Sequence, residues 1–325
     1  MSTIRWILID QLTLSLPIIQ ESKKGDVFLM VEDRESCTIV PHHKKKLVFQ
    51  LSAMRHFAET LRAMSYEVAY FDINYFSKGH NRDMQGVLRS VIKLYSSKEV
   101  FVTQPSDYHV DEAVSRLCQE AGVTCSVLPD TRYFSDRMVL QESAAANKRT
   151  LMEFFYRKMR KKTGLLMDGD QPISGQWNYD KDNRKPLPKA IDIPERLRFE
   201  PDSITQQVMD EVASSFPDHM GDVQDFHYAV TSSHANQAWA QFLEEYLPQF
   251  GPYQDAMRVQ EPFLFHAVVS MYLNNGLLCP INYSVKNNKL VDTTNCTSDN
   301  PYYVLKSEST EDLLDTDNPD GCSPN

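Results

Sequence analysis

Short apolar runs alternate with amphipathic stretches through the first 130 residues. The runs are four to six residues long and end near a turn or a polar break, as buried strands do; they cover residues 4–9, 27–31, 68–73, 100–103 and 123–128. Residues 44–64 carry leucine, methionine and alanine at steps of three and four, which builds one apolar face of a helix. Residues 83–95 and 110–121 are two further predicted helices.

This alternation predicts an α/β fold over residues 1–130, with an open, mostly parallel sheet that carries helices on both faces. Sheets of this kind bind ligands at the carboxyl ends of their strands. The first predicted strand runs into Asp10, and neither GxGxxG nor GxxxxGK[ST] occurs in the chain. We therefore expect a ligand site at the strand ends that does not use a glycine-rich phosphate loop.

The pattern changes after residue 130. Residues 131–201 hold a basic helix, expected over 144–163, and a connection with five prolines between residues 172 and 201. Helical periodicity returns in residues 202–284, with helices expected over 203–216, 232–246 and 262–278, so a second, all-helical unit begins here. Residues 285–325 carry three lysines against eight acids and are predicted to form a disordered acidic tail.

Composition limits the class of protein. The 325 residues are 42% hydrophobic and 24% charged, with a formal net charge of -10, which is typical of a soluble protein. No apolar run approaches the ~18 residues of a membrane helix, and the first residues do not read as a signal peptide, so we expect a cytoplasmic monomer. The six cysteines form no CxxC pair, which argues against a metal site and favours reduced thiols.

The basic helix is the first candidate binding surface. Seven cations face Glu153 alone between residues 148 and 162. Lysine and arginine gain affinity for nucleic acid by releasing counterions from phosphates, without reading sequence. The alternative is a solvated face on a helix that packs Leu151, Phe155 and Met159 inward.

Two histidines and three lysines begin the predicted helix at residue 44. A histidine pair can bind a metal, but no third or fourth ligand accompanies His42 and His43, so a cluster at the helix start is favoured. Cations at a helix N-terminus oppose the helix dipole, so an anion such as Asp10, Glu32 or Asp33, or a bound ligand, should lie nearby. The mouth of the sheet is therefore a candidate ligand site.

Aromatic and polar residues also stand together later in the chain. Trp177 lies in the proline-rich connection, where it either fixes the loop to the surface or meets bases or a planar cofactor. His266, Ser270 and Asn274 recur every four residues and would form one polar stripe on the last predicted helix. Such a stripe suits a buried polar ligand or a hydrogen-bonded core network.

Several segments together resemble a known family. They read HHKKKLVFQLSAMRHFAETL, MEFFYRKMRKKTGLLMDGDQP followed by GQWNYDKDNR, FGPYQDAM, and EPFLFHAVVSMYLNNGLL. In this order they resemble the photolyase-related branch of the cryptochrome/photolyase family, whose members are flavoproteins with an iron–sulfur cluster. The resemblance runs from about residue 4 to residue 280.

The resemblance implies an antenna domain, a linker and a helical domain that holds FAD and docks on damaged DNA. Family members use a photoexcited reduced flavin to send an electron into a flipped-out pyrimidine dimer. By motif, the FAD neighbours would be Tyr253, Gln254, Asp255, His266 and Ser270, and Asp10 would belong to an antenna site, of the lumazine type in related proteins. The DNA contacts would be Lys148, Arg149, Arg157, Lys158, Arg160, Lys161, Lys162 and Arg184. No catalytic residue carries over.

The sequence departs from the family at two places. Ile39 replaces a common aromatic residue before the histidine pair, and Gln50 stands where the family tends to have an apolar one. After residue 280 the rest of the flavin domain is not matched, and with it go most FAD contacts and the cysteines of the cluster, which needs four thiolates. We expect the chain to bind no cluster and to be inactive in repair on its own.

Three hypotheses about function remain open at this point. The chain belongs to a light-dependent DNA-repair flavoprotein as a C-terminally truncated product, or it is a light-independent module. In the second case the α/β domain binds a nucleotide or chromophore and the helical part serves as a partner surface. The third hypothesis is a fragment without function, because a helical domain cut after its first helices would expose apolar faces.

Overall fold

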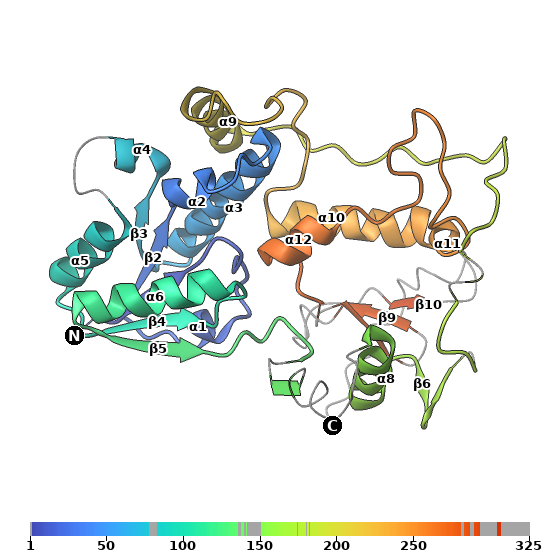
Figure 1. The fold of residues 1–325 in the computed structure, drawn as a ribbon, viewed down its shortest axis with the longest axis horizontal. Coiled ribbons are helices and arrows are strands. Elements are labelled where there is room, and N and C mark those ends of the chain that lie inside the picture. The colour runs from blue at the N-terminus through green and yellow to red at the C-terminus, as the bar shows by residue number, and fades with distance from the viewer. Residues whose placement is uncertain are drawn as a thin grey trace. The chain divides into compact units, whose positions relative to one another are not determined.

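The computed structural model describes residues 2–77, 83–135, 138–139, 141, 151–173, 175–179, 181 and 183–280, together with the backbone of three later strands. Its contacts define two compact units (Figure 1). The first comprises residues 1–131, 198–235 and 274–277, and the second comprises the rest. The domain limits predicted at residues 131, 202 and 285 stay predictions, although residues 198–235 pack with the first unit.

The first unit contains a five-stranded parallel sheet (Figure 1). Its strands are β1 (Ile4–Ile7), β2 (Val27–Val31), β3 (Glu67–Phe71), β4 (Glu99–Thr103) and β5 (Thr124–Leu128). They lie in the order β3-β2-β1-β4-β5, and every neighbouring pair is parallel. The predicted α/β class is confirmed. Each predicted strand is found, with ends that shift by one or two residues.

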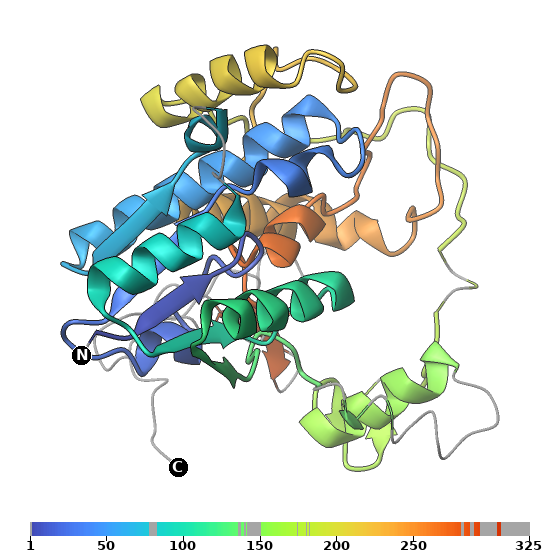
Figure 2. The same ribbon diagram turned by 60° about the vertical axis from the view of Figure 1, so that its left-hand side comes forward.

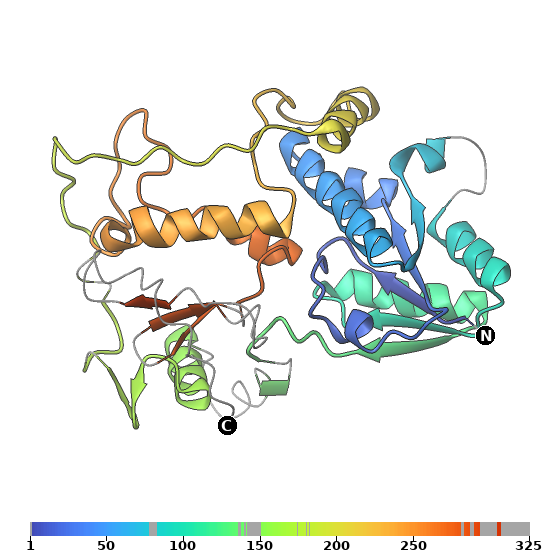
Figure 3. The same ribbon diagram turned by 180° about the vertical axis from the view of Figure 1, so that it is seen from behind.

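Helices cover both faces of this sheet (Figures 2 and 3). They are α1 (Pro17–Gln20), α2 (Arg34–Thr38), α3 (Lys44–Ala63), α4 (Ile73–Ser77), α5 (Met84–Tyr95) and α6 (Tyr108–Ala121). Buried residues of α5 and α6 join those of the strands in one apolar cluster, whereas α3 buries Leu47, Val48 and Leu51. Because Asp83 and Asp107 cap α5 and α6, and Gly122 ends α6 at φ 70°, local sequence fixes where these helices begin and end.

A further helix, α9 (Ser203–Ser215), packs on α3 in the same unit (Figure 1). Asp202 caps it by accepting a hydrogen bond of 2.9 Å from the amide of Thr205, and its carboxylate lies 3.3 Å from Nε2 of His56 on α3. Glu211, on the following turns, accepts a hydrogen bond of 2.5 Å from Arg55 of α3. Two carboxylates therefore hold α9 in place.

We expect α9 to detach from α3 in acid. Burial opposes ionisation, but hydrogen bonds from Arg55 and Gln207 outweigh it and lower the pKa of Glu211; hydrogen bonds from Thr205 and the charge of His56 likewise lower the pKa of Asp202. A lowered folded-state pKa adds stability above the ordinary carboxyl pKa of about 4, and this stability is lost as pH falls through the folded value. The protection factors of the α9 amides against hydrogen exchange, corrected for the intrinsic rate at each pH, should fall below about pH 4 before those of the sheet amides. An equal fall in Glu211→Gln and the unmodified chain would contradict this role for Glu211.

The second unit contains α8 (Met152–Thr163), the short strands β6 (Met167–Asp168) and β7 (Gln171–Pro172), and most of α10 (Ser232–Gln241). The last helix continues through a π-helical turn, Phe242–Tyr246, into α11 (Leu247–Phe250). The core of this unit consists of Phe242, Leu243, Tyr246, Leu264 and Phe265. The helix predicted over residues 232–246 is thus present, with a π-helical end.

The helix predicted over residues 262–278 is wrong for its first half. Only α12 (Ser270–Asn275) forms, because Leu264 and Val268 have φ values of 40° and 53°, which a right-handed helix does not allow. Arg196 donates hydrogen bonds to the carbonyl oxygens of Leu264 and His266, so these groups are satisfied without a helix. The polar stripe of His266, Ser270 and Asn274 therefore does not lie on one helix face.

Three short strands form an antiparallel sheet near the end of the chain. They are β8 (Tyr283–Lys286), β9 (Lys289–Asp292) and β10 (Val304–Lys306). Their valine, leucine and tyrosine residues favour strands, which differs from the disordered tail predicted for residues 285–325. The rest of that range lies outside the described residues. Of the helices in the described part of the chain, none is long and apolar enough to cross a bilayer.

Candidate functional site

A cavity of about 670 Å³ opens at the carboxyl ends of β1, β2 and β4. Along the chain, β2 and β3 are added on one side of β1, and β4 and β5 are added on its other side. The strand order therefore reverses between β1 and β4, although all strands are parallel. Doubly wound sheets bind ligands at this point, where loops from opposite directions diverge. The volume lies within the range of about 300–1,000 Å³ that small-molecule sites occupy.

The cavity walls come from several parts of the first unit. The segment that follows β1 contributes Leu8, Ile9 and Asp10, and β4 is followed by Pro105, Ser106 and Asp107. Helices α2, α3 and α6 supply most of the remaining side chains, together with residues 83–85. Asp10, predicted to be an antenna-site residue, therefore lies at the cavity, while its role stays a prediction.

Carboxylates outnumber cations around this cavity. The acids are Asp10, Asp33, Glu35, Asp83, Asp107 and Glu120, and the formal cations are Lys46 and Arg116. Asp33, Asp83 and Asp107 each accept backbone hydrogen bonds as helix caps, so their charge is partly offset by the helix N-termini. The site is nevertheless unfavourable for a phosphate group and offers many acceptors to hydroxyl or N–H donors.

Two titratable side chains in the wall are neutral at physiological pH. Burial, followed by the charges of Asp33 and Glu32, raises the pKa of the Cys37 thiol to about 12. Burial and the neighbouring Lys46 and His219 lower the pKa of His42. Cys37 is therefore protonated and a poor nucleophile, and His42 presents an uncharged imidazole to the cavity.

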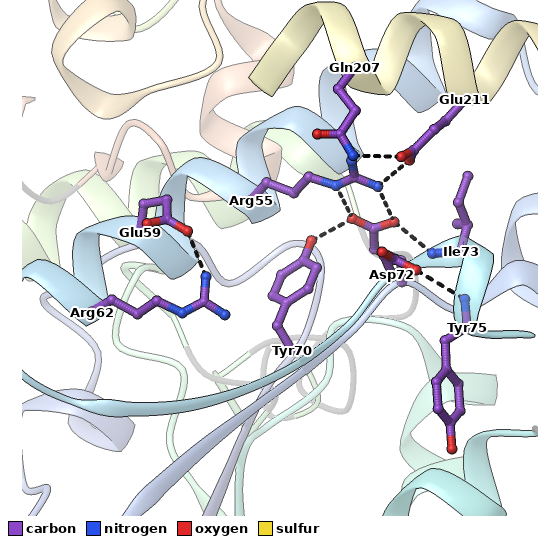
Figure 4. Close-up of polar contacts among 10 residues, drawn as sticks. Arg55, Glu59, Arg62, Tyr70, Asp72, Ile73, Tyr75, Gln207 and Glu211 are labelled. Atoms are coloured by element: carbon purple, nitrogen blue, oxygen red, sulfur yellow. Dashed lines mark hydrogen bonds and ion pairs between the residues drawn. The ribbon is translucent and has the colours of Figure 1, made fainter. Parts of the chain in front are cut away.

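A buried ion-pair cluster holds the corner between β2 and α2 beside the cavity (Figure 4). The Glu32 carboxylate is completely buried and accepts two hydrogen bonds from Arg55, of 2.7 and 3.0 Å. It also accepts from the Tyr70 hydroxyl at 2.6 Å and the Ile73 amide at 2.9 Å. Since Val31 and Asp33 on either side of Glu32 line the cavity, the cluster positions part of its wall.

The anion expected beside the lysines of α3 is therefore not Glu32, whose oxygens are already engaged by Arg55 and Tyr70. Lys44 and Lys45 instead donate to the carbonyl oxygens of Pro217 and Asp225, at 3.0 and 3.4 Å. His43 caps α3 by accepting a hydrogen bond of 3.1 Å from the Lys45 amide, which confirms the cluster at the helix start. Sequence alone missed Arg55, although a glutamate directly after a buried strand signals a buried charge.

The predicted FAD neighbours lie in the second unit. Gln254, Asp255, His266 and Ser270 are exposed, and only Tyr253 is half-buried, with its ring 5.9 Å from that of Phe265. Asp255 accepts a hydrogen bond of 3.0 Å from Arg184. These exposed side chains do not by themselves enclose a flavin, and their role stays a prediction.

The predicted DNA contacts fall into three sets: residues outside the described range, arginines that contact other residues of the unit, and exposed lysines. Lys148 and Arg149 lie outside the described residues. Arg157 and Arg160 contact the Trp177 ring at 5.2 and 5.4 Å from its centre, and Arg157 also pairs with Glu153 at 2.8 Å.

The two arginines of α8 are thus engaged within the unit. Their contacts with Trp177 agree with the first of its two interpretations, in which the ring fixes its loop to the surface. Lys158, Lys161 and Lys162 are exposed. Helix α8 has no buried residue; Leu151 is exposed, and Phe155 and Met159 are half-buried, so the alternative of a helix that packs all three inward is met only in part.

The fold is a doubly wound α/β domain with a cavity of small-molecule size at its switch point. Residues 5–228 match the family described as deoxyribodipyrimidine photo-lyase-related protein. The chain belongs to this family, which confirms the resemblance found in its sequence.

Similar proteins extend the comparison. A (6-4) photolyase of Agrobacterium fabrum is 38% identical over 279 residues, which is 86% of this chain and 55% of that protein. An uncharacterised protein of Acanthamoeba polyphaga mimivirus is 27% identical over 176 residues, covering 52% of this chain and 86% of that protein. The crystal structure of a class III photolyase from Agrobacterium tumefaciens shares the fold, with a TM-score of 0.51 at 14% identity over 86% of this chain and 51% of that one. The chain therefore spans about half the length of both photolyases.

Proposed function

We propose that this chain belongs to a light-dependent DNA-repair system, in which its α/β unit binds an antenna chromophore in the cavity at the strand ends. The observation that carries the proposal is the cavity itself, which lies within the residues that match the photolyase-related family. An antenna absorbs light and passes its energy to a second pigment, so its protein needs only to bind, orient and shield it. Shaped apolar walls with a few polar groups do this without catalytic side chains.

The charges around the cavity favour one class of chromophore. Six carboxylates against two cations repel phosphate, which argues against the nucleotide alternative. An uncharged heteroaromatic ring with a polyhydroxyl chain, as in a ribityl lumazine, matches apolar walls such as Leu47 and Val114, because its hydroxyls donate to the carboxylates. Cys37 and His42 are both neutral. An uncharged ring that binds next to them therefore does not have to remove water from a charged group.

From the family we also propose that the protein acts on damaged DNA and binds FAD. The exposed lysines of α8 support a contact to phosphates, and a (6-4) photolyase of Agrobacterium fabrum is 38% identical to this chain over 279 residues. Tyr253, Gln254, Asp255, His266 and Ser270 stay proposed FAD neighbours by motif.

A binding assay tests the proposed ligand class. The purified chain is titrated with ribityl lumazine while the ligand's fluorescence anisotropy is followed, and with riboflavin and riboflavin 5′-phosphate as a pair that differs only in the phosphate. We expect the lumazine to bind and riboflavin to bind at least tenfold tighter than its phosphate, since one like-charge contact costs on the order of 1 kcal/mol or more. Tighter binding of the phosphate or of AMP would favour the nucleotide alternative. If none of these ligands binds, the antenna role is wrong.

A further inference from the structure

Helix α8 has two faces with different surroundings. Glu153, Arg157 and Arg160 share one face, because they follow each other at steps of three and four residues. Both arginines lie over the Trp177 ring, and Arg160 also donates to the carbonyl oxygen of Leu165 at 3.2 Å. This face is therefore occupied by contacts within the unit, where α8 and β6 lie close together (Figures 1 and 2).

A second, exposed strip of α8 carries an aromatic ring among cations. Its members are all exposed: Phe154, Lys158, Lys161 and Lys162 on the helix, and Leu151 at its N-cap. Half of Phe154, 53%, is open to solvent, which is unusual for a phenylalanine of a folded unit. We call these five residues the Phe154–lysine stripe.

The charge of this stripe is largely uncompensated. Lys161 approaches Asp170 at 3.7 Å, with both side chains at least half exposed. Lys158 and Lys162 have no acidic partner among the residues that the structure describes. The lysines and the exposed Phe154 ring are thus available to a partner that carries both negative charges and flat, apolar groups.

We propose that the Phe154–lysine stripe binds DNA whose bases are unpaired, with one base stacked on Phe154 and the neighbouring phosphates on the lysines. This inference rests on the proposed function and extends it to the kind of DNA bound. Every base offers a π-face for stacking, and only an unpaired, unstacked base can place it on a side chain. A duplex would meet the same lysines through its phosphates but would leave Phe154 without a partner.

A groove on the same helix is a further apolar surface. It measures about 540 Å³ and is lined mainly by apolar and aromatic side chains, with Glu153 among them. From α8 it includes Phe155, Tyr156 and Met159, whereas Phe154 and the lysines of the stripe do not line it. The groove is therefore separate from the proposed stacking position at Phe154.

Fluorescence anisotropy with two labelled probes, a 20-nucleotide oligothymidine and a 20-base-pair duplex, tests the proposal on the full chain. Stacking on an aromatic residue contributes about 1–3 kcal/mol per base, so Phe154→Ala should weaken oligothymidine binding by roughly fivefold or more. The same change should alter duplex affinity less than twofold. Phe154→Tyr, which keeps the ring, should restore binding of the oligothymidine.

Changing the lysines tests the contact between α8 and DNA phosphates separately from stacking on Phe154. Lys158→Gln with Lys162→Gln should weaken both probes and reduce the salt dependence for oligothymidine by about 1.4 in the slope of log K against log salt. If this double variant leaves both affinities unchanged, or if the unmodified chain binds neither probe, the DNA contact of α8 fails, and this inference with it.

If the lysine variant weakens binding but Phe154→Ala affects both probes equally or neither, only the stacking inference is overturned. Sedimentation that shows a dimer dispersed by Phe154→Ala would assign the stripe to a second copy of the chain and overturn the proposal as well. Equal thermal midpoints of all variants establish that they are folded.

Discussion

Replacing Arg55 by alanine should destabilise the α/β unit by about 3–5 kcal/mol, because it leaves the fully buried Glu32 carboxylate without its charged partner. The Arg55 side chain is 11% exposed and bridges Glu32 and Glu211, which lie 23 and 156 residues away in the sequence. The carboxylates in turn raise the pKa of Arg55, although burial alone would lower it. Urea unfolding followed by far-UV circular dichroism measures the loss.

Helix α3 offers a matched control for this prediction. Arg62 pairs with Glu59 at 2.6 Å, but both side chains are more than 40% exposed, so Arg62→Ala should cost about 1 kcal/mol or less. If Arg55→Ala and Arg62→Ala lower the free energy of unfolding equally, the buried cluster does not hold the unit together. A double change of Glu32 and Arg55 to methionine should be less harmful than Arg55→Ala alone, since the fully buried Glu32 carboxylate is removed together with its partner and only Glu211, 15% exposed, loses its arginine.

Filling the cavity should abolish most chromophore binding without unfolding the protein. Ala113 lies on α6 and lines the cavity, so Ala113→Trp places an indole in the space that the ligand needs. Overpacking of about 1–3 kcal/mol corresponds to a loss of roughly five- to 150-fold in lumazine affinity. The same titration that tests the proposed function measures it.

Ser115 supplies the control, because it lies on the same helix, is exposed and does not line the cavity. Ser115→Trp should leave both lumazine affinity and thermal stability near those of the unmodified chain. Unchanged binding in Ala113→Trp, with the ligand still bound at one site per chain, would show that the chromophore binds elsewhere.

Much of the α/β unit could be predicted from local pattern. Runs such as residues 27–31 are short and apolar on both faces, and the helices between them begin at capping residues such as Asp83 and Asp107. Because the carboxyl ends of parallel strands meet at one edge, the position of Asp10 after the first strand was enough to predict a site there. The motifs likewise sufficed for the family.

The helix over residues 262–278 shows where local pattern failed. Its apolar spacing was helical, yet Arg196 donates to the carbonyls of Leu264 and His266, and Leu264 and Phe265 pack with Tyr246. A distant side chain and a distant core together outweighed a weak local preference for helix. The polar stripe of His266, Ser270 and Asn274 was therefore predicted on a helix face that does not form, whereas the proposed FAD neighbours rest on motif alone.

The sequence was sufficient to predict the succession of strands and main helices, the family, and the end of the sheet at which the cavity opens, because these depend on neighbouring residues and on a repeating spacing. What each charge does became visible only in the folded structure. It gave Glu32 to Arg55 and not to the lysines of α3, and it separated the arginines of α8, which face Trp177, from its outward lysines. Partners of this kind lie tens of residues apart, and only folding brings their atoms within the few ångströms over which hydrogen bonds and buried charges act.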